Sequence, residues 1–60
     1  MSLLVRVTRI KGGAFFINED HIETMESNPD TVITLVNGHR YVVAESTEEI
    51  LARIQLFRHS

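Results

Sequence analysis

The chain has 60 residues, of which 43% are hydrophobic, and it contains no cysteine. A chain of this length forms one domain, residues 1–60, and buries only about 60% of the surface that its unfolded form exposes. Disulfides are therefore excluded as a source of added stability, and the three histidines lack metal-ligand spacing, which leaves self-association. The formal net charge of −2 argues against a protein that binds nucleic acid or an anionic membrane.

The first part of the chain predicts a β-hairpin. Residues 3–10 alternate apolar and polar side chains, as a half-buried strand does. Lys11, Gly12 and Gly13 interrupt this strand, and we expect the two glycines to supply the positive φ angles of the hairpin turn. Residues 14–17 form the returning strand, in which Phe16 points to the opposite face from its neighbours.

The next segment predicts a short capped turn and a third strand. Asn18 can accept a hydrogen bond from an unpaired backbone N–H group, so we expect it to cap a helical turn. Residues 22–27 fit a strand with Ile22 facing one side and Met25 the other. A helix is the alternative, because Ile22 and Met25 are also three residues apart. A turn at Asn28-Pro29-Asp30 ends the segment.

Residues 31–36 and 39–44 predict a second β-hairpin. Both segments are rich in β-branched side chains, and Asn37-Gly38 between them is the strongest short hairpin signal. A two-residue turn pairs Val32 with Val43 on one face and Ile33 with Val42 on the other. This register gives both faces of the hairpin apolar pairs.

A C-terminal helix is predicted over residues 47–57. Ser46 and Glu49 form a capping box at its start. We expect Glu49 to pair with Arg53 one turn later. The apolar stripe at helical spacing consists of Ile50, Leu51, Ile54 and Phe57. The predicted fold is therefore α+β: a small, strongly bent antiparallel sheet of four to five strands followed by one helix.

The predicted sheet has more apolar surface than one helix can cover. We expect the second face of the sheet, and the helix residue that lies off the stripe, to be buried in a homo-oligomer. The candidate self-association residues are Phe16, Ile33, Leu35, Tyr41, Val43 and Leu56.

Basic residues provide a second candidate surface. Arg6, Arg9 and Lys11 cluster near the N-terminus, and Arg40 lies in the predicted second hairpin. We take these four residues as a candidate polar docking surface for a protein partner.

The sequence offers little that predicts catalysis. Ser46 is accounted for as a helix cap, and no serine stands in a nucleophile elbow. The carboxylates of residues 19–26 lack the spacing of a calcium loop, and Lys11-Gly12-Gly13 lacks the spacing of a phosphate loop. We therefore expect no catalytic residue, no metal and no cofactor.

No apolar run approaches the roughly 20 residues of a membrane-spanning helix. The start of the chain is interrupted by Arg6 and does not resemble a signal peptide. We therefore expect a cytoplasmic protein without direct membrane insertion.

A series of turn and strand signals follows the chain almost from end to end. They are Val7-Thr8-Arg9 before a glycine turn, Phe15 to Asn18, Ile22-Glu23-Thr24, Pro29-Asp30-Thr31, Thr34-Leu35, Asn37-Gly38, Tyr41-Val42-Val43, and Glu45-Ser46 before a helix with Glu49. In this order and spacing the chain resembles the small flagellar FlbD family, to which the swarming motility protein SwrD belongs.

The resemblance implies a non-enzymatic accessory protein of the bacterial flagellum. It implies a place on the cytoplasmic side of the motor, where the protein would support motor or stator function and swarming through protein–protein contacts. The expected partners are a second copy of the chain and a flagellar motor or stator component, with no nucleic acid.

Two other functions remain open from the residues. The strand–turn–strand–helix arrangement of residues 22–57 also resembles part of a LytTR-type DNA-binding domain. The scarcity of basic residues in that half of the chain argues against nucleic-acid binding. A purely structural fragment or a toxin–antitoxin-like partner is the third possibility.

Overall fold

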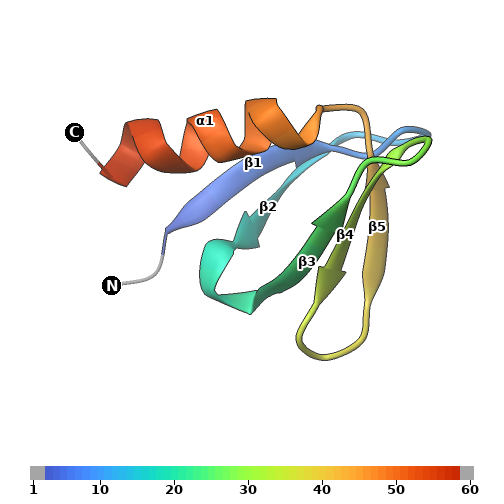
Figure 1. The fold of residues 1–60 in the computed structure, drawn as a ribbon, viewed down its shortest axis with the longest axis horizontal. Helices are drawn as coiled ribbons and strands as arrows, with labels where there is room; N and C mark the ends of the chain where they lie inside the picture. The colour runs from blue at the N-terminus through green and yellow to red at the C-terminus, as the bar shows by residue number, and fades with distance from the viewer. Residues whose placement is uncertain (1–2, 59–60) are drawn as a thin grey trace.

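The structure is a computed structural model that describes residues 3–58, with the side chains of residues 3–56. Its elements follow the chain in the predicted order (Figure 1). They are β1 (Leu4–Thr8), β2 (Ala14–Asn18), the 3₁₀ helix η1 (Glu19–His21), β3 (Ile22–Glu26), β4 (Thr31–Leu35), β5 (Arg40–Val43) and α1 (Thr47–Arg58). The predicted α+β class is confirmed.

The strands form two antiparallel sheets, β1-β2 and β3-β4-β5. A bridge between Arg9 and Val43 joins the end of β1 to the end of β5. Two backbone hydrogen bonds support it: the Ile10 N–H donates to the Val42 carbonyl (3.2 Å), and the Ala44 N–H donates to the Thr8 carbonyl (2.8 Å). The strands therefore follow one another in space as β2-β1-β5-β4-β3. The β1-β2 pair stands at an angle to the other three strands, and α1 lies along β1 (Figure 1).

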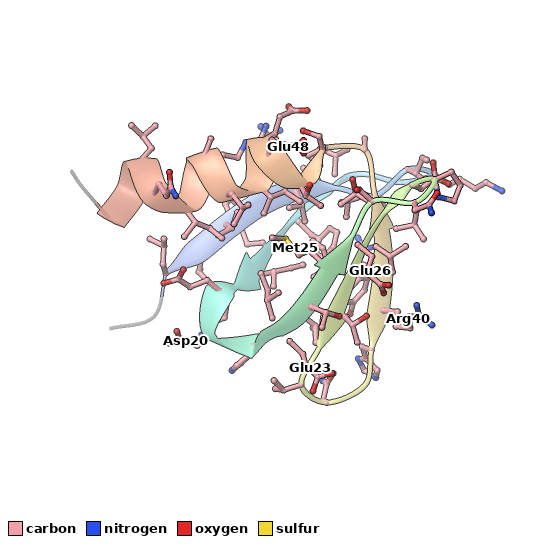
Figure 2. The ribbon with its side chains drawn as sticks, in the orientation of Figure 1. Asp20, Glu23, Met25, Glu26, Arg40 and Glu48 are labelled. Atoms are coloured by element: carbon pink, nitrogen blue, oxygen red, sulfur yellow. The ribbon has the colours of Figure 1, made fainter. Side chains whose placement is uncertain are left out.

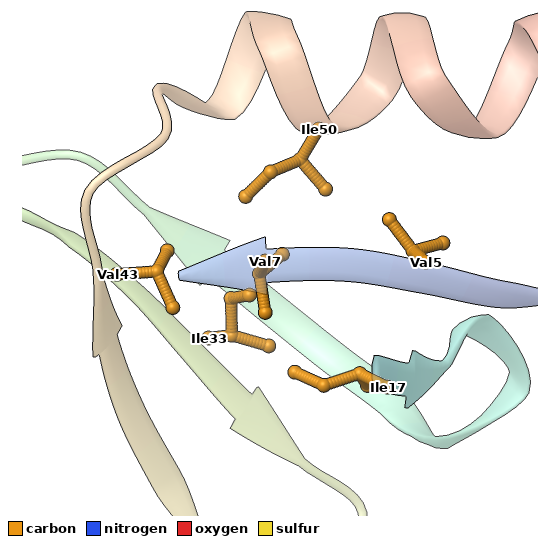
Figure 3. Packing of buried hydrophobic residues seen from close by; sticks show 6 residues of the cluster. All are labelled: Val5, Val7, Ile17, Ile33, Val43 and Ile50. Carbon is orange, nitrogen blue, oxygen red and sulfur yellow. The ribbon is translucent and has the colours of Figure 1, made fainter. Parts of the chain in front are cut away.

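The hydrophobic core lies where the two sheets and the helix meet (Figure 3). Both sheets and α1 contribute branched aliphatic side chains, which suit a pleated, buried surface. The buried members are Val5, Val7, Ile17, Ile33, Val43 and Ile50. Partly buried side chains pack around them: Phe15, Ile22, Met25, Leu35, Tyr41 and Ile54.

The predicted register of the second hairpin is wrong by one residue. Ile33 lies opposite Tyr41 instead of Val42, and Val43 lies opposite Thr31. The loop has three residues, because the Leu35 N–H donates to the His39 carbonyl (2.8 Å) and the Gly38 N–H donates to the Leu35 carbonyl (2.9 Å). Gly38 has a φ of 93°, as expected where a type I turn is followed by a left-handed residue.

This slip changes which side chains share a face. When the pairing of two strands shifts by one residue, each side chain of one strand shares a face with a different set of side chains on the other strand. In the observed register Ile33, Tyr41 and Val43 all face the core, while Val42 and Arg40 are exposed on the other face. Both faces still carry an apolar pair, as predicted, but with other members: Ile33 with Tyr41 on the core face and Val32 with Val42 on the outer face.

The first turn also differs from its prediction. Gly38 is the glycine with positive φ within residues 3–58, so Gly12 and Gly13 do not use that conformation. The turn is closed by the Gly12 N–H donating to the Arg9 carbonyl (3.2 Å) and by the Arg9 N–H donating to the Gly13 carbonyl (3.2 Å). β1 ends at Thr8 instead of residue 10, because the chain then turns to bridge with β5.

The third segment is a strand and not a helix, as predicted. The prediction that Ile22 and Met25 face opposite sides of it is wrong. The pairing with β4 shifts between Ile22 and Thr24, which is a β-bulge. The extra residue, Glu23, allows Ile22 and Met25 to pack on the same core instead of facing opposite sides. Met25 points into the interior in Figure 2.

The start of α1 follows its prediction closely. The Glu49 N–H donates to Ser46 Oγ and the Ser46 N–H donates to Glu49 Oε1, each at 3.1 Å, so the capping box is confirmed. In the stripe, Ile50 is buried and Ile54 packs on the core, but Leu51 is 47% exposed and does not belong to it. The side chain of Phe57 lies outside the described residues.

The predicted cap of η1 is confirmed as well. The Asp20 N–H donates to Asn18 Oδ1 at 2.9 Å. This bond satisfies a backbone donor that has no partner inside so short a helix. The turn fixes the direction in which the chain leaves β2 for β3.

Candidate interaction site

One basic side chain is held on the surface by two aromatic rings. The Cζ atom of Arg9 lies 4.0 Å from the centroid of the Phe15 ring and 5.7 Å from that of Tyr41. The two rings are 5.1 Å apart and tilted by 53°. We call Arg9, Phe15 and Tyr41 the Arg9 stack.

Three separate elements build the Arg9 stack. Arg9 follows β1, Phe15 belongs to β2 and Tyr41 belongs to β5. The bridge from Arg9 to Val43 brings the turn after β1 against β5. A Cβ atom at Gly12 would lie 3.3 Å from both Cβ and Cδ of Arg9, so the missing side chain leaves room for the arginine.

The stack leaves the hydrogen-bonding groups of Arg9 available. A guanidinium over an aromatic ring is attracted through its flat face, while its N–H donors lie in its plane. Arg9 is exposed, and among the described side chains, those of residues 3–56, the ion pairs join Arg40 to Glu26 and Arg53 to Glu45. Arg9 can therefore offer a carboxylate on another molecule a paired, charge-assisted hydrogen bond.

A buried carboxylate anchors the chain next to Arg9. Glu45 Oε1 accepts a hydrogen bond from the Thr8 N–H (2.8 Å), and Oε2 accepts from Thr8 Oγ1 (3.0 Å). Arg53 Nη1 donates to Glu45 Oε2 (3.0 Å) and to the Arg6 carbonyl (2.7 Å). We call Thr8, Glu45 and Arg53 the Glu45 clamp. It ties α1 to β1 one residue before Arg9 and thus fixes the backbone of the stack.

The clamp keeps Glu45 charged although its side chain is only 9% exposed. Burial raises the pKa of this carboxyl, but the hydrogen bonds from Thr8 and Arg53 oppose burial and lower the pKa to about 2. Glu45 is therefore an anion at neutral pH, with its charge matched inside the fold. The predicted pair of Glu49 with Arg53 does not form, because Arg53 is turned toward Glu45.

The four residues of the predicted polar docking surface do not gather in one place. Arg9 and Lys11 lie in the turn between β1 and β2, whereas Arg6 lies on β1 opposite Phe16. Arg40 begins β5, with Nη2 4.0 Å from Glu26 Oε1 (Figure 2). As the neighbour of Tyr41 in a strand, Arg40 faces away from the Arg9 stack.

The six candidate self-association residues divide into three groups. Phe16 is 63% exposed and Leu56 is 70% exposed, so both are available to a second molecule. Leu35 and Tyr41 are partly buried against the core. Ile33 and Val43 are buried within one chain, and their assignment to an interface is wrong. The physical reason is the one-residue slip in register, which turns both side chains inward.

Sequence reasoning missed the partners of Arg9 and the whole Glu45 clamp. The alternation of β2 places Phe15 on the opposite face from Phe16, and Phe15 packs against the core. The hydrogen bond from Thr8 to Glu45 spans 37 positions. The available signal was an acidic residue directly before a helix cap, and it does not identify the partner.

The described residues hold no other kind of site. Within that part of the chain there is no pocket, and no group of three or more His, Cys, Asp or Glu side chains could hold a metal ion. None of the helices in this part of the chain has the length and apolar character needed to cross a membrane.

Comparison with known proteins gives one family. The model of the FlbD family, described as flagellar and swarming motility proteins, matches residues 4–60. Neither the curated proteins nor the solved structures gave a match.

Proposed function

Because the chain belongs to the FlbD family of flagellar and swarming motility proteins, we propose that it is a non-enzymatic accessory protein of the bacterial flagellum. It works in the cytoplasm, at the inner side of the motor. It supports motor or stator function, and hence swarming, by contact with a motor or stator component, as the resemblance to the FlbD family implies.

The observation that carries this proposal is the Arg9 stack. An exposed arginine normally loses side-chain freedom when it binds a partner, which costs about 0.5–1.5 kcal/mol. Contacts with Phe15 and Tyr41 hold Arg9 before any partner arrives. The matching group on the partner is a carboxylate, since its two oxygens fit the guanidinium fork.

Exposed apolar side chains support self-association as a second part of the proposal. Single exposed apolar residues are common on monomers, but this small chain has many of them. They are Leu4, Ile10, Phe16, Val36, Val42, Leu51 and Leu56.

No observation favours the nucleic-acid-binding alternative. Arg53 is engaged by Glu45, and Arg40 lies near Glu26. Neither arginine stands in a basic patch that could follow a phosphate backbone.

The proposal is tested by complementation of a strain from which the gene has been deleted. Arg9→Ala and Arg9→Lys are compared with Arg40→Ala, which removes the same charge from an exposed arginine outside the stack. We expect both Arg9 variants to lose most swarming, since lysine cannot reproduce the flat, forked group. Arg40→Ala should swarm like the wild type.

Thermal unfolding of the purified variants checks that the Arg9 substitutions leave the fold intact. Wild-type swarming by a folded Arg9→Ala variant would contradict the proposed docking site. Full swarming by the deletion strain itself would contradict the proposed flagellar role.

A further inference from the structure

The bridge between Arg9 and Val43 joins the two sheets into one series of strands, β2-β1-β5-β4-β3. This series has two free edges, formed by β2 at one end and β3 at the other. Within residues 3–58, β2 pairs only with β1 and β3 pairs only with β4. The free edge of a strand presents backbone N–H and C=O groups that can pair with another chain. The two edges differ in which residues they present.

The hydrogen bonds beside β2 show which of its backbone groups face outward. The Glu19 N–H donates to the Leu3 carbonyl (2.9 Å), and the Arg9 N–H donates to the Gly13 carbonyl (3.2 Å). In an antiparallel pair, residues that exchange these bonds alternate with residues that do not. It follows that Phe15 and Ile17 bond toward β1. The backbone groups of Ala14, Phe16 and Asn18 point to the free edge.

The two edge strands also differ in the number of charged side chains that they carry. β2 has the sequence AFFIN and carries no charged residue. β3 has the sequence IETME and carries Glu23 and Glu26 (Figure 2). Charged residues on an edge strand discourage pairing with another copy, because like charges would meet. The β3 edge is protected in this way, whereas the β2 edge is not.

We propose that β2 is the contact strand of a symmetric homodimer, in which it pairs antiparallel with β2 of a second copy. This inference rests on the proposed self-association and names its surface. The two-fold axis passes beside Phe16, the central residue of β2. There the Phe16 N–H of each copy donates to the Phe16 carbonyl of the other. On either side, Ala14 of one copy lies opposite Asn18 of the other.

The side chain of Phe16 gains from this arrangement. It is 63% exposed in one chain and lies opposite Arg6 of β1. In the dimer the two Phe16 rings become cross-strand neighbours on the outer face, where aromatic pairs add about 0.2–1 kcal/mol over alanine pairs. A second copy is the occupant that this edge fits, since an uncharged strand paired with itself brings no like charges together.

Single cysteines test the pairing, because the natural chain has none. Residues that face each other in such a hydrogen-bonded pair have Cα atoms about 5.5 Å apart, within the reach of a disulfide. Under mild oxidation with copper phenanthroline, most chains of the Phe16→Cys variant should become covalent dimers. Thr24→Cys, at the centre of β3, is the matched control on the other free edge and should remain largely monomeric.

The register has its own test. Ala14→Cys and Asn18→Cys should each give little covalent dimer alone, but an equimolar mixture should give the mixed dimer. Equal cross-linking of Phe16→Cys and Thr24→Cys would overturn the proposal. So would a mixture that cross-links no better than its two components.

A mass measurement covers the case in which a cysteine disturbs the contact. By light scattering, the wild type should approach twice the 6.9 kDa of one chain as concentration rises. Phe16→Glu should weaken the dimer at least tenfold, while Leu56→Glu, an equal change on α1, should not. If Leu56→Glu dissociates the dimer and Phe16→Glu does not, the chain self-associates but not through β2, and the proposed interface is overturned. A wild type that stays monomeric would overturn both, while the swarming of Arg9 variants would still test the motor contact.

Discussion

Glu45 links α1 to β1 through its side-chain carboxylate. Its carboxylate accepts hydrogen bonds from Thr8 and Arg53, and Arg53 also reaches the Arg6 carbonyl. A buried charge is costly unless it is paired and hydrogen-bonded, and removing one partner leaves the other without compensation. The clamp therefore holds strand and helix in one relative position.

The clamp predicts a loss of stability in acid. The pKa of Glu45 is about 2 in the folded chain against an ordinary value of 4.5, so folding favours the ionised form. Its contribution is fully present above pH 4.5 and is lost as the pH falls toward 2. The difference corresponds to about 3 kcal/mol of unfolding free energy. Chemical denaturation at a series of pH values between 2 and 7 measures it.

Two variants isolate this contribution. Glu45→Gln should lower the unfolding free energy at pH 7 and flatten its dependence on pH below 4.5. Glu26→Gln, which changes an exposed carboxylate, should keep the wild-type dependence. An unchanged acid transition in Glu45→Gln would show that the clamp does not set the pH dependence.

The residues of the candidate site were only partly predictable from the sequence. The cluster of basic residues near the N-terminus is enough to indicate that Arg9 belongs to a docking surface. Its support by Tyr41 depends on a bridge between residues 34 positions apart, Arg9 and Val43. Local pattern carries no information about such a contact.

At the scale of elements, Gly38 fixes the register of the β4–β5 hairpin. Its φ of 93° is unfavourable for residues with a Cβ atom. Gly38→Ala should therefore lower the unfolding free energy by about 1 kcal/mol or more. Gly13→Ala is the control, because a Cβ there meets nothing within 4 Å and its φ is not positive. Urea denaturation compares the two, and equal losses would contradict the assigned role of Gly38.

The elements themselves were well predicted, but the register of the second hairpin and the faces of β3 were not. Asn37-Gly38 suits both a two-residue turn and a three-residue loop, since Gly38 accepts a positive φ in either. The longer loop places Ile33 and Val43 on the same core. The bulge at Glu23 similarly brings Ile22 and Met25 together. At both places the local sequence allows two backbone conformations, and the one that buries more apolar side chains in the core is the one that forms.

At the scale of the whole molecule, stability depends on a small core. Folded domains have unfolding free energies of roughly 0.05–0.15 kcal/mol per residue. For a chain of 60 residues this is only a few kcal/mol. A single large cavity can therefore remove most of the stability.

Ile50 joins α1 to both sheets in that core (Figure 3). Ile50→Ala should cost about 2–5 kcal/mol, enough to leave much of the protein unfolded at 37 °C. Leu51→Ala, at an adjacent and 47% exposed position, should cost far less. Circular dichroism during heating measures both, and similar losses would contradict the assigned packing of α1.

We propose that Arg9, held by Phe15 and Tyr41, connects this protein to the flagellar motor. Stall torque of single motors, read from beads tethered to flagella in the deletion strain, tests it most directly. With Arg9→Ala as the only copy, we expect the torque of the deletion strain, whereas Arg40→Ala should restore wild-type torque. Wild-type torque from a stably folded Arg9→Ala variant would contradict the proposed role of Arg9.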